Sequence, residues 1–371
     1  MKSLLVLKSA LVSLIAFVLF MIIAPKTSQC QADVRFVNEF LNIGVGAKAH
    51  GMFGSVAATV DDISAAYWNP AGLARIESPA QINAMHASWF GGIANYDYLA
   101  FGKRFDDRKN SYGSMTLIRL GVDNIPNTLN LLDDDGTVNF NNVTEFSAAD
   151  YAFLLSYGQD LGIEGLSIGG SAKVIYRNIG SFGNAFGFGF DLGIQYKIGN
   201  LSFGLMGRDI TTTVNNWSFS LDEDEIRVFQ REGNVVPVSS TEVALPKIVL
   251  AAAYKIDNGT RFTYLLETDL RLSSDGTKSG IFSGENIGID PTAGFEIGYD
   301  RKVFFRAGIG NIQNIVNENA DAAFEFTPNI GLGVDLGLVN IDYALTNIGS
   351  VSGALVSHVF SLKLDLHGDR L

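Results

Sequence analysis

Cysteine is almost absent from this chain of 371 residues: Cys30 is the only one, so no disulfide can form within the chain. Proline is scarce, with 8 residues, and the charged residues make up 18% of the sequence, below the usual quarter. Beyond Ala24, no apolar run is long enough to cross a membrane as a helix. These absences exclude a domain stapled by disulfides and a bundle of transmembrane helices.

The N-terminus has the features of an export signal. Lys2 and Lys8 precede an apolar run from Ala10 to Ala24, and the small residue Ala32 follows at a distance suited to cleavage. We therefore expect residues 1–32 to be a signal peptide. They contain three lysines and no acidic residue, so removing them changes the formal net charge from −12 to −15. An acidic, exported chain has no electrostatic basis for binding nucleic acid.

Glycine and phenylalanine are abundant, with 40 and 26 residues. In the segment 186–198, "FGFGFDLGIQYKI", alternate positions are apolar, and those between them are glycine or polar. Successive side chains of a strand point to opposite faces, so the segment has one apolar face and one glycine-rich face. Segments 262–272, 330–336 and 360–366 repeat the pattern. The second face of a soluble β-sandwich would carry more Lys, Glu and Thr, so we predict an all-β transmembrane barrel with a crowded lumen.

The number of predicted strands supports the barrel. Fourteen candidate strands can be counted, an even number, as a bacterial barrel of one chain requires. Short connections alternate with long ones at 121–148, 210–245, 274–289 and 311–325, which is typical of periplasmic turns and extracellular loops. The predicted strands are 80–90, 94–105, 111–120, 149–160, 166–178, 185–198, 201–209, 246–256, 260–273, 290–299, 303–310, 326–337, 339–347 and 354–366.

No recognisable constellation of catalytic or metal-binding residues is present. The four histidines, His50, His86, His358 and His367, have neither triad nor metal-ligand spacing, and no "GxSxG" or Walker pattern occurs. The acidic run Asp133, Asp134 and Asp135 lacks the ligand pattern of an EF-hand loop. We therefore expect no enzyme, no metal and no cofactor. Charges on the polar strand faces are expected to pair in the lumen; they are Glu267, Asp269, Glu296 and Asp335 with Lys173, Arg177, Arg271 and Arg306.

Residues 33–78, ahead of the first predicted strand, form a glycine-rich segment that ends in "DDISAAYWNPAGLARI". A compact segment of this kind suits a plug inside the lumen, and residues 79–371 would then be the barrel. Asp61 or Asp62 is a suitable N-cap for a short helix over Ile63–Trp68, because an acidic group complements the helix dipole. The segment lacks the "GxGxxG" or "GK[ST]" spacing of a phosphate-binding loop.

The helix should end at Asn69, since a residue before proline is disfavoured in helical geometry. Gly72 would then permit a turn into the first strand. We interpret this motif as architecture and not as a reaction centre. Its structural residues are Gly44, Gly46, Gly51, Asp61, Asp62, Trp68, Asn69, Pro70, Ala71 and Gly72.

The stretch "FLNIGVGAKAHGMFGSVAATVDDISAAYWNPAGLA", residues 40–74, resembles the N-terminal signature of the PorV/PorQ family of outer-membrane proteins. That family lies within the wider group of FadL-like 14-stranded barrels. The C-terminal "HVFSLKLDL" from His358 resembles the family's closing strand. His50 and Phe53 depart from the expected apolar residue and glycine, and the chain ends in "HGDRL" instead of an aromatic residue.

The resemblance implies a non-enzymatic component of the type 9 secretion system in the outer membrane of a Gram-negative bacterium of the Bacteroidota type. Its partners would be translocon or attachment-complex proteins, the C-terminal signal domains of secreted cargo, and outer-membrane lipid or lipopolysaccharide. The alternative is a FadL-like channel for hydrophobic small molecules. A lipopolysaccharide-modifying enzyme is a weaker third interpretation. The outer loops would bind the partners through the candidate residues Leu131, Leu132, Asp133, Asp134, Asp135, Phe140, Trp217, Phe219 and Phe229.

Overall fold

The computed structural model describes residues 37–133, 136–231, 233–273, 282–283, 288–316, 322–347 and 356–366. The predicted signal peptide and the loop residues Asp134 and Asp135 lie outside these ranges. So do the loop segment 274–281 and the C-terminal "HGDRL".

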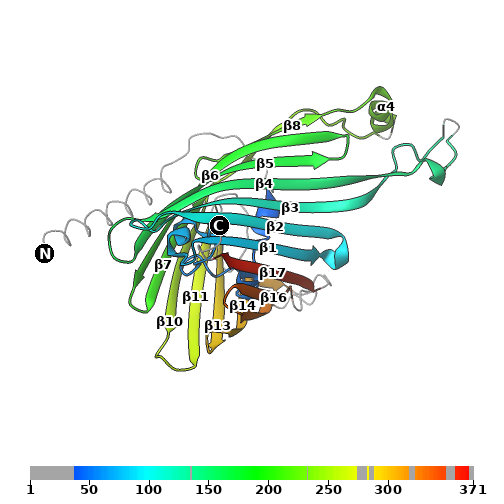
Figure 1. Ribbon diagram of the computed structural model, residues 1–371. Coiled ribbons are helices and arrows are strands. Elements are labelled where there is room, and N and C mark those ends of the chain that lie inside the picture. Colours follow the sequence, from blue (N-terminus) through cyan, green and yellow to red (C-terminus); the bar gives the residue numbers. More distant parts are fainter. Residues whose placement is uncertain are drawn as a thin grey trace. The chain divides into compact units, whose positions relative to one another are not determined.

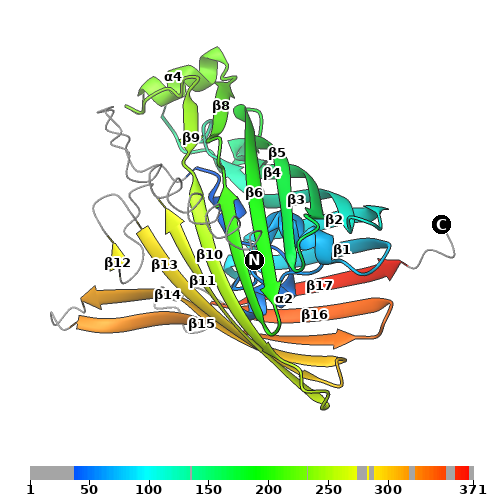
Figure 2. The ribbon, with the colours of Figure 1, turned by 90° about the vertical axis from the view of Figure 1, so that its left-hand side faces the viewer.

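Seventeen strand segments are hydrogen-bonded into one antiparallel sheet, which curves around the N-terminal helices (Figures 1 and 2). The segments are β1 (Ala80–Trp89), β2 (Ala94–Asp106), β3 (Ser111–Asn127), β4 (Thr144–Asp160), β5 (Leu166–Ile179), β6 (Gly183–Ile198), β7 (Leu201–Arg208), β8 (Thr213–Phe219), β9 (Thr241–Ala244), β10 (Lys247–Ile256), β11 (Phe262–Ser273), β12 (Phe282–Ser283), β13 (Gly288–Tyr299), β14 (Val303–Val316), β15 (Ala322–Asp335), β16 (Val339–Thr346) and β17 (Ser357–Leu366).

These seventeen segments make fourteen barrel strands, as predicted. β6 pairs with β7 at one end and with β8 at the other, so β7 and β8 are one interrupted strand. β10 and β9 are the two pieces of the next strand, because β10 pairs with β7 and β9 with β8. β12 is a two-residue spur on β13. β1 pairs with both β2 and β17, which closes the barrel.

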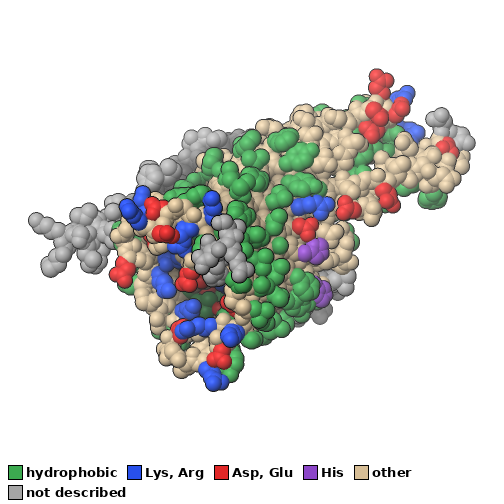
Figure 3. Space-filling model, viewed as in Figure 1, with side chains coloured by type: hydrophobic (Ala, Val, Ile, Leu, Met, Phe, Trp, Pro, Cys, Tyr) green, Lys and Arg blue, Asp and Glu red, His purple; other side chains and the backbone are tan. Residues whose placement is uncertain are grey.

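The two faces of the wall follow the alternation in the sequence. On β6, Phe186, Phe188 and Phe190 point outward and are half exposed or more, whereas Ala185 and Asp191 are buried on the lumen side. Figure 3 shows hydrophobic side chains gathered over the outer surface of the strands. An apolar outer face of this kind is suited to contact with hydrocarbon. No helix among the described residues is long and apolar enough to span a membrane.

The long connections are shorter than predicted. β3 continues to Asn127 and β4 begins at Thr144, so the loop between them is 128–143 and not 121–148. The predicted loop 210–245 contains β8, β9 and the helix α4 (Glu223–Arg231), and most of 311–325 belongs to β14 and β15. Outside hydrocarbon, an outward side chain need not be apolar, so hydrogen-bonded strands continue where the alternation has ended. A bulge in β3 between Val122 and Ile125 also breaks the period of two.

From residue 37 onward, four short helices precede β1: η1 (Glu39–Asn42), α2 (Ala47–Gly51), α3 (Ala65–Trp68) and η2 (Pro70–Arg75). Together they form what we call the plug, residues 37–78. α2 contacts β14–β17 and η2 contacts β3–β6, so the plug touches opposite sides of the wall. The two other short helices lie in connections between strands, η3 (Phe90–Gly92) and η4 (Phe140–Asn142).

Candidate functional site

The plug backbone rests directly against glycines on the lumen face of the wall. A Cβ added to Gly169 would lie 2.3 Å from the carbonyl carbon of Pro70, and one added to Gly193 would lie 2.0 Å from Asn69 Oδ1. Both distances are far below van der Waals contact, so any side chain at either position would have to displace the plug. The same holds on other strands, at Gly158, Gly204, Gly294, Gly308 and Gly310. The glycine-rich face seen in the sequence is therefore the seat of the plug.

Asn69 joins the plug to itself and to the wall. Its side-chain amide donates to the carbonyl of Ala57 at 2.8 Å and to that of Ile194 on β6 at 3.1 Å, and its Oδ1 accepts from the backbone of Ala71 at 3.2 Å. Asn69 is extended (φ −164°), and α3 ends just before it, as the following proline predicts. The amide needs both its donor and its acceptor groups here, which explains an asparagine at this position.

Asp61 and Asp62 have separate roles. Asp61 forms an ion pair with Lys48 at 3.2 Å. Asp62 Oδ1 accepts from the backbone N–H of Ser64 at 2.8 Å, so Asp62 caps the turn that leads into α3. The helix itself is shorter than predicted and begins at Ala65.

The glycines of the motif serve close packing and left-handed backbone. Gly44 and Gly46 have φ values of +96° and +85°, and the Trp68 ring covers Gly44. Gly51 lies against the backbone of Gly331 on β15. The predicted turn at Gly72 is wrong: this residue lies inside η2, and its missing side chain makes room for the Val60 carbonyl, 2.3 Å from where a Cβ would be.

Two carboxylates on β11 accept the plug's backbone hydrogen bonds. The backbone N–H of Ala58 donates to Glu267 Oε1 at 2.6 Å, and that of Ala57 donates to Asp269 Oδ2 at 3.4 Å. The hydroxyl of Thr59 donates to the other oxygen of Glu267. Both carboxylates are fully buried, so they hold the plug and are not open to a substrate.

Other charges on the lumen face form ion pairs, although of the four acids expected to pair only Glu296 does so among the described residues, and Asp335 accepts instead from the backbone N–H of Gly337. The Lys173 ammonium lies 2.8 Å from Asp191 and 2.7 Å from Asp209, and all three side chains are largely buried. Arg306 pairs with Glu296 and with Asp342, each at 2.6 Å. Arg177 pairs with Asp150 and with Glu242, at 2.9 and 3.4 Å. Among the described residues, no group of three or more potential metal ligands is found.

The wall is interrupted between β7 and β8. Asp209 and Thr212 have left-handed backbone (φ 52° and 60°), and Ile210 keeps a single hydrogen bond to the Phe190 carbonyl, at 2.9 Å. The neighbouring strand is broken at the same level, between β9 and β10. A cavity of about 30 Å³ lies on the lumen side and a groove of about 720 Å³ on the outer side, and Asp191 lines both.

Apolar side chains line one side of the lumen near η1. Leu41 and Ile43 of the plug, together with Leu120 and Val122 of β3, pack on a buried apolar cluster and remain partly exposed. That cluster includes Tyr96, Ile118, Leu154 and Ile175 from β2 to β5. The lumen thus has one apolar side next to the ion pairs of Lys173.

The candidate loop residues occupy three different settings. Leu131, Leu132 and Asp133 lie in the 128–143 loop, where Asp133 accepts hydrogen bonds from Asn139 and Asn142. Phe140 is 77% exposed on η4, and Phe229 lies on α4. Trp217 and Phe219 are not in a loop but stack on β8, with Trp217 buried under the Arg177 guanidinium.

The sequence did not single out the cluster of Lys173, Asp191 and Asp209, or the Arg208 guanidinium that lies 4.4 Å from the Tyr67 ring. Lys173, Asp191 and Arg208 occupy polar positions in alternating segments, which is the available signal, whereas Asp209 lies just beyond β7 and has no such signal. Their assembly depends on the register between strands and on the interruption after Arg208.

Replacing Gly169 by alanine is expected to loosen the plug, because the added methyl group would collide with Pro70. We expect a loss of roughly 1–3 kcal/mol in stability and faster cleavage of the plug in limited proteolysis. The adjacent Gly170→Ala is the matched control: it faces outward, 3.2 Å from the mobile end of Leu192. Equal protease resistance of the two variants would contradict the close contact between the plug and Gly169.

The pH dependence of stability should carry a contribution from His50. Burial lowers the pKa of this plug residue from 6.5 to about 4, although its ring bonds to the Gly44 carbonyl. Between these pH values the unfolded chain binds a proton that the folded chain does not, so stability falls as the pH falls. Relative to His50→Gln, the wild type should lose about 3 kcal/mol from pH 7 to pH 4. Parallel unfolding curves of the two proteins across this range would refute the assignment.

Comparison with known proteins agrees with this architecture. A sequence profile of the "Uncharacterised protein family (UPF0164)" matches residues 20–202, just under half of the chain. No curated protein matches the sequence.

Several solved structures are similar in fold at low sequence identity. The Pseudomonas putida toluene transporter TodX is 14% identical with a TM-score of 0.55, covering 88% of this chain and 99% of its own. The monoaromatic hydrocarbon channel CymD is 12% identical with a TM-score of 0.54, covering 88% and 98%. A FadL homologue of Pseudomonas aeruginosa is 12% identical with a TM-score of 0.47, covering 87% and 98%. The chain is therefore a 14-stranded antiparallel β-barrel that resembles TodX and CymD in fold, and its first half is similar in sequence to UPF0164.

Proposed function

We propose that the protein is an outer-membrane channel for small hydrophobic molecules. The observation that carries the proposal is the apolar side of the lumen, where Leu41 and Ile43 of the plug and Leu120 and Val122 of β3 pack against one buried apolar cluster. A water-filled pore would line its lumen with polar groups on all sides. The structures named toluene transporter and hydrocarbon channel share the fold, which supports the same substrate class here.

The position of the plug limits the path that a hydrophobic molecule could take through the barrel. Gly158, Gly169 and Gly204, which seat it, lie a few residues from the ends of their strands that carry the short turns. These turns mark the periplasmic side. A molecule that enters from the extracellular side thus meets the apolar surface first and the tightly packed plug afterwards. The interruption after Arg208 offers a sideways route that leaves the plug in place.

Uptake by cells tests the proposal. The barrel is expressed in a Gram-negative host that lacks its own channel for hydrophobic molecules, and entry of labelled toluene and of a labelled long-chain fatty acid is measured. Leu41→Glu and Leu120→Glu should each reduce uptake at least fivefold, because a carboxylate on the apolar surface opposes passage of an apolar molecule. Val138→Glu, at an exposed loop position, is the control. Uptake no greater than in cells without the barrel would refute the proposal.

A second candidate function is the binding of exported proteins as part of a type 9 secretion system in a Bacteroidota-type bacterium, as a member of the PorV/PorQ family. The exposed apolar side chains of the outer loops favour it: Phe140, Val235 and Val238 are 77%, 88% and 72% exposed. Large exposed apolar groups of this kind are suited to an interaction surface. Cargo, translocon or attachment-complex proteins would bind there, through the loops 128–143 and 220–240.

Cargo display and hydrocarbon uptake, measured in one strain, distinguish the two functions. In a type 9-secreting bacterium, replacing Phe140, Val235 and Val238 by serine should abolish cargo display if the loops receive cargo, and should leave hydrocarbon uptake unchanged. Intact cargo display in this triple variant would exclude the second function.

A further inference from the structure

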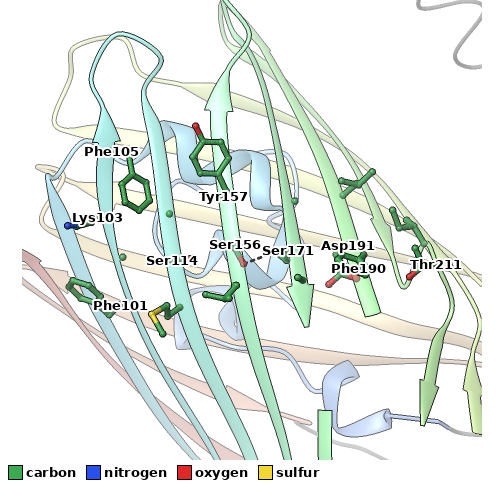
Figure 4. A pocket seen from close by; sticks show the side chains of 18 residues that line it. Phe101, Lys103, Phe105, Ser114, Ser156, Tyr157, Ser171, Phe190, Asp191 and Thr211 are labelled. Atoms are coloured by element: carbon green, nitrogen blue, oxygen red, sulfur yellow. Dashed lines mark hydrogen bonds between the residues drawn. The ribbon is translucent and has the colours of Figure 1, made fainter. Parts of the chain in front are cut away.

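A long apolar groove of about 720 Å³ runs across the outer face of β2–β6. Figure 4 shows Phe101, Lys103 and Phe105 on one side of it, and Phe190 and Thr211 on the other. Two rows of directly paired residues form it. One row is Phe101, Met115, Leu155, Ala172 and Phe190, and the other is Lys103, Gly113, Tyr157, Gly170 and Leu192.

Small residues give the groove its depth. Gly170 stands between Tyr157 and Leu192 in one row, and Ala172 stands between Leu155 and Phe190 in the other. The large side chains on either side are about half exposed, so they form walls above a floor of backbone. On the outer face of a membrane barrel, such a groove is open to hydrocarbon and not to water.

The groove has one charged end. Lys103 is exposed, and its ammonium lies 5.9 Å from the centre of the Phe105 ring; no carboxylate partner is found for it among the described residues. The adjacent turn carries Asp106, Asp107, Arg108 and Lys109, which are neutral as a group. Asp191 at the far end is bound to Lys173 on the lumen side. The positive charge of Lys103 is therefore the uncompensated charge that a molecule bound in the groove would contact.

The direction of the groove relates this end to the membrane surface. Lys103 lies three residues from the end of β2 at a short turn, whereas Leu192 lies six residues from the corresponding end of β6. The groove thus begins at the periplasmic boundary and rises into the membrane. The groove crosses the four spacings between neighbouring strands from β2 to β6, and at about 4.8 Å each these give a length of about 19 Å. This length is similar to the thickness of one leaflet, which is half of a hydrocarbon core of about 30 Å.

We propose that this groove holds an acyl chain of an inner-leaflet phospholipid whose phosphate pairs with Lys103. The chain would lie over Gly170 and Ala172, and its end would reach Leu192. The stem of Lys103 follows the apolar wall while its ammonium remains at the boundary, a common arrangement for lysine at membrane surfaces. This inference does not depend on what the lumen carries.

Lipid binding to the purified full-length barrel tests the proposal. Delipidated protein in mild detergent is mixed with phosphatidylglycerol or with diacylglycerol of the same chains, and bound lipid is counted by native mass spectrometry. The wild type should retain phosphatidylglycerol at least threefold more than diacylglycerol, and its thermal midpoint should rise only with the phospholipid. Lys103→Gln should remove this preference, because the phosphate then has no cation to pair with.

Ala172→Phe should fill the groove and abolish retention of both lipids. Ala252→Phe is its control, since Ala252 also points outward, on β10, away from the groove. Equal retention by the two phenylalanine variants would overturn the proposal even if both fold normally. Displacement of the lipid by toluene, or dimerisation of the barrel that Ala172→Phe prevents, would assign the groove to another occupant and also overturn it.

Discussion

The backbone of the plug touches the backbone of the barrel wall at Gly158 and Gly169, the Asn69 side chain touches it at Gly193, and at these points the wall has no room for a side chain. Glycine in a strand normally weakens the strand, because it has no side chain to pack and loses more conformational freedom on folding. Here that weakness is offset by the plug, which packs where side chains would otherwise be. The plug and the wall are thus one packing unit. The glycine-rich face of the wall would be unpacked without the plug, and the plug could not lie so close to a wall that carried larger side chains.

Such close approach also removes water from the plug's backbone. A buried N–H without a partner costs about 1–3 kcal/mol, and the N–H groups of Ala57 and Ala58 face a wall strand whose own backbone bonds are used within the sheet. Glu267 and Asp269 supply the missing acceptors. The glycines and the carboxylates therefore both allow the plug to lie against the wall, on different strands. The glycines leave space for the plug backbone, and the carboxylates accept hydrogen bonds from its N–H groups. This explains why two acids can be fully buried without forming a reaction centre.

The alternation in segments such as 186–198 predicted both faces and the number of strands, because the period of two is imposed on every residue that faces hydrocarbon. The same signal predicted that β3 ends and β4 begins several residues closer to the membrane than they do. Strand pairing continues beyond the membrane, where outward side chains need not be apolar. The plug was predicted as a structural unit, and the stop at Asn69 follows from local chemistry alone. The cluster around Lys173 could not be found, because its members meet only through strand register and the interruption between β7 and β8. The role of Gly72 was misjudged for a similar reason: a packing contact leaves no local signature.

The interruption after Arg208 relates the two proposed binding events. Lys173, held by Asp191 and Asp209, lines the lumen cavity, and Asp191 lines both this cavity and the outer groove. Separating a buried ion pair costs several kcal/mol, so a neutral molecule would pass only when these side chains move together and keep their pairing. A lipid chain in the groove would cover the outer side of the same interruption. Any molecule that leaves through the wall would then have to displace that chain, so occupancy of the groove would oppose exit and favour a closed wall.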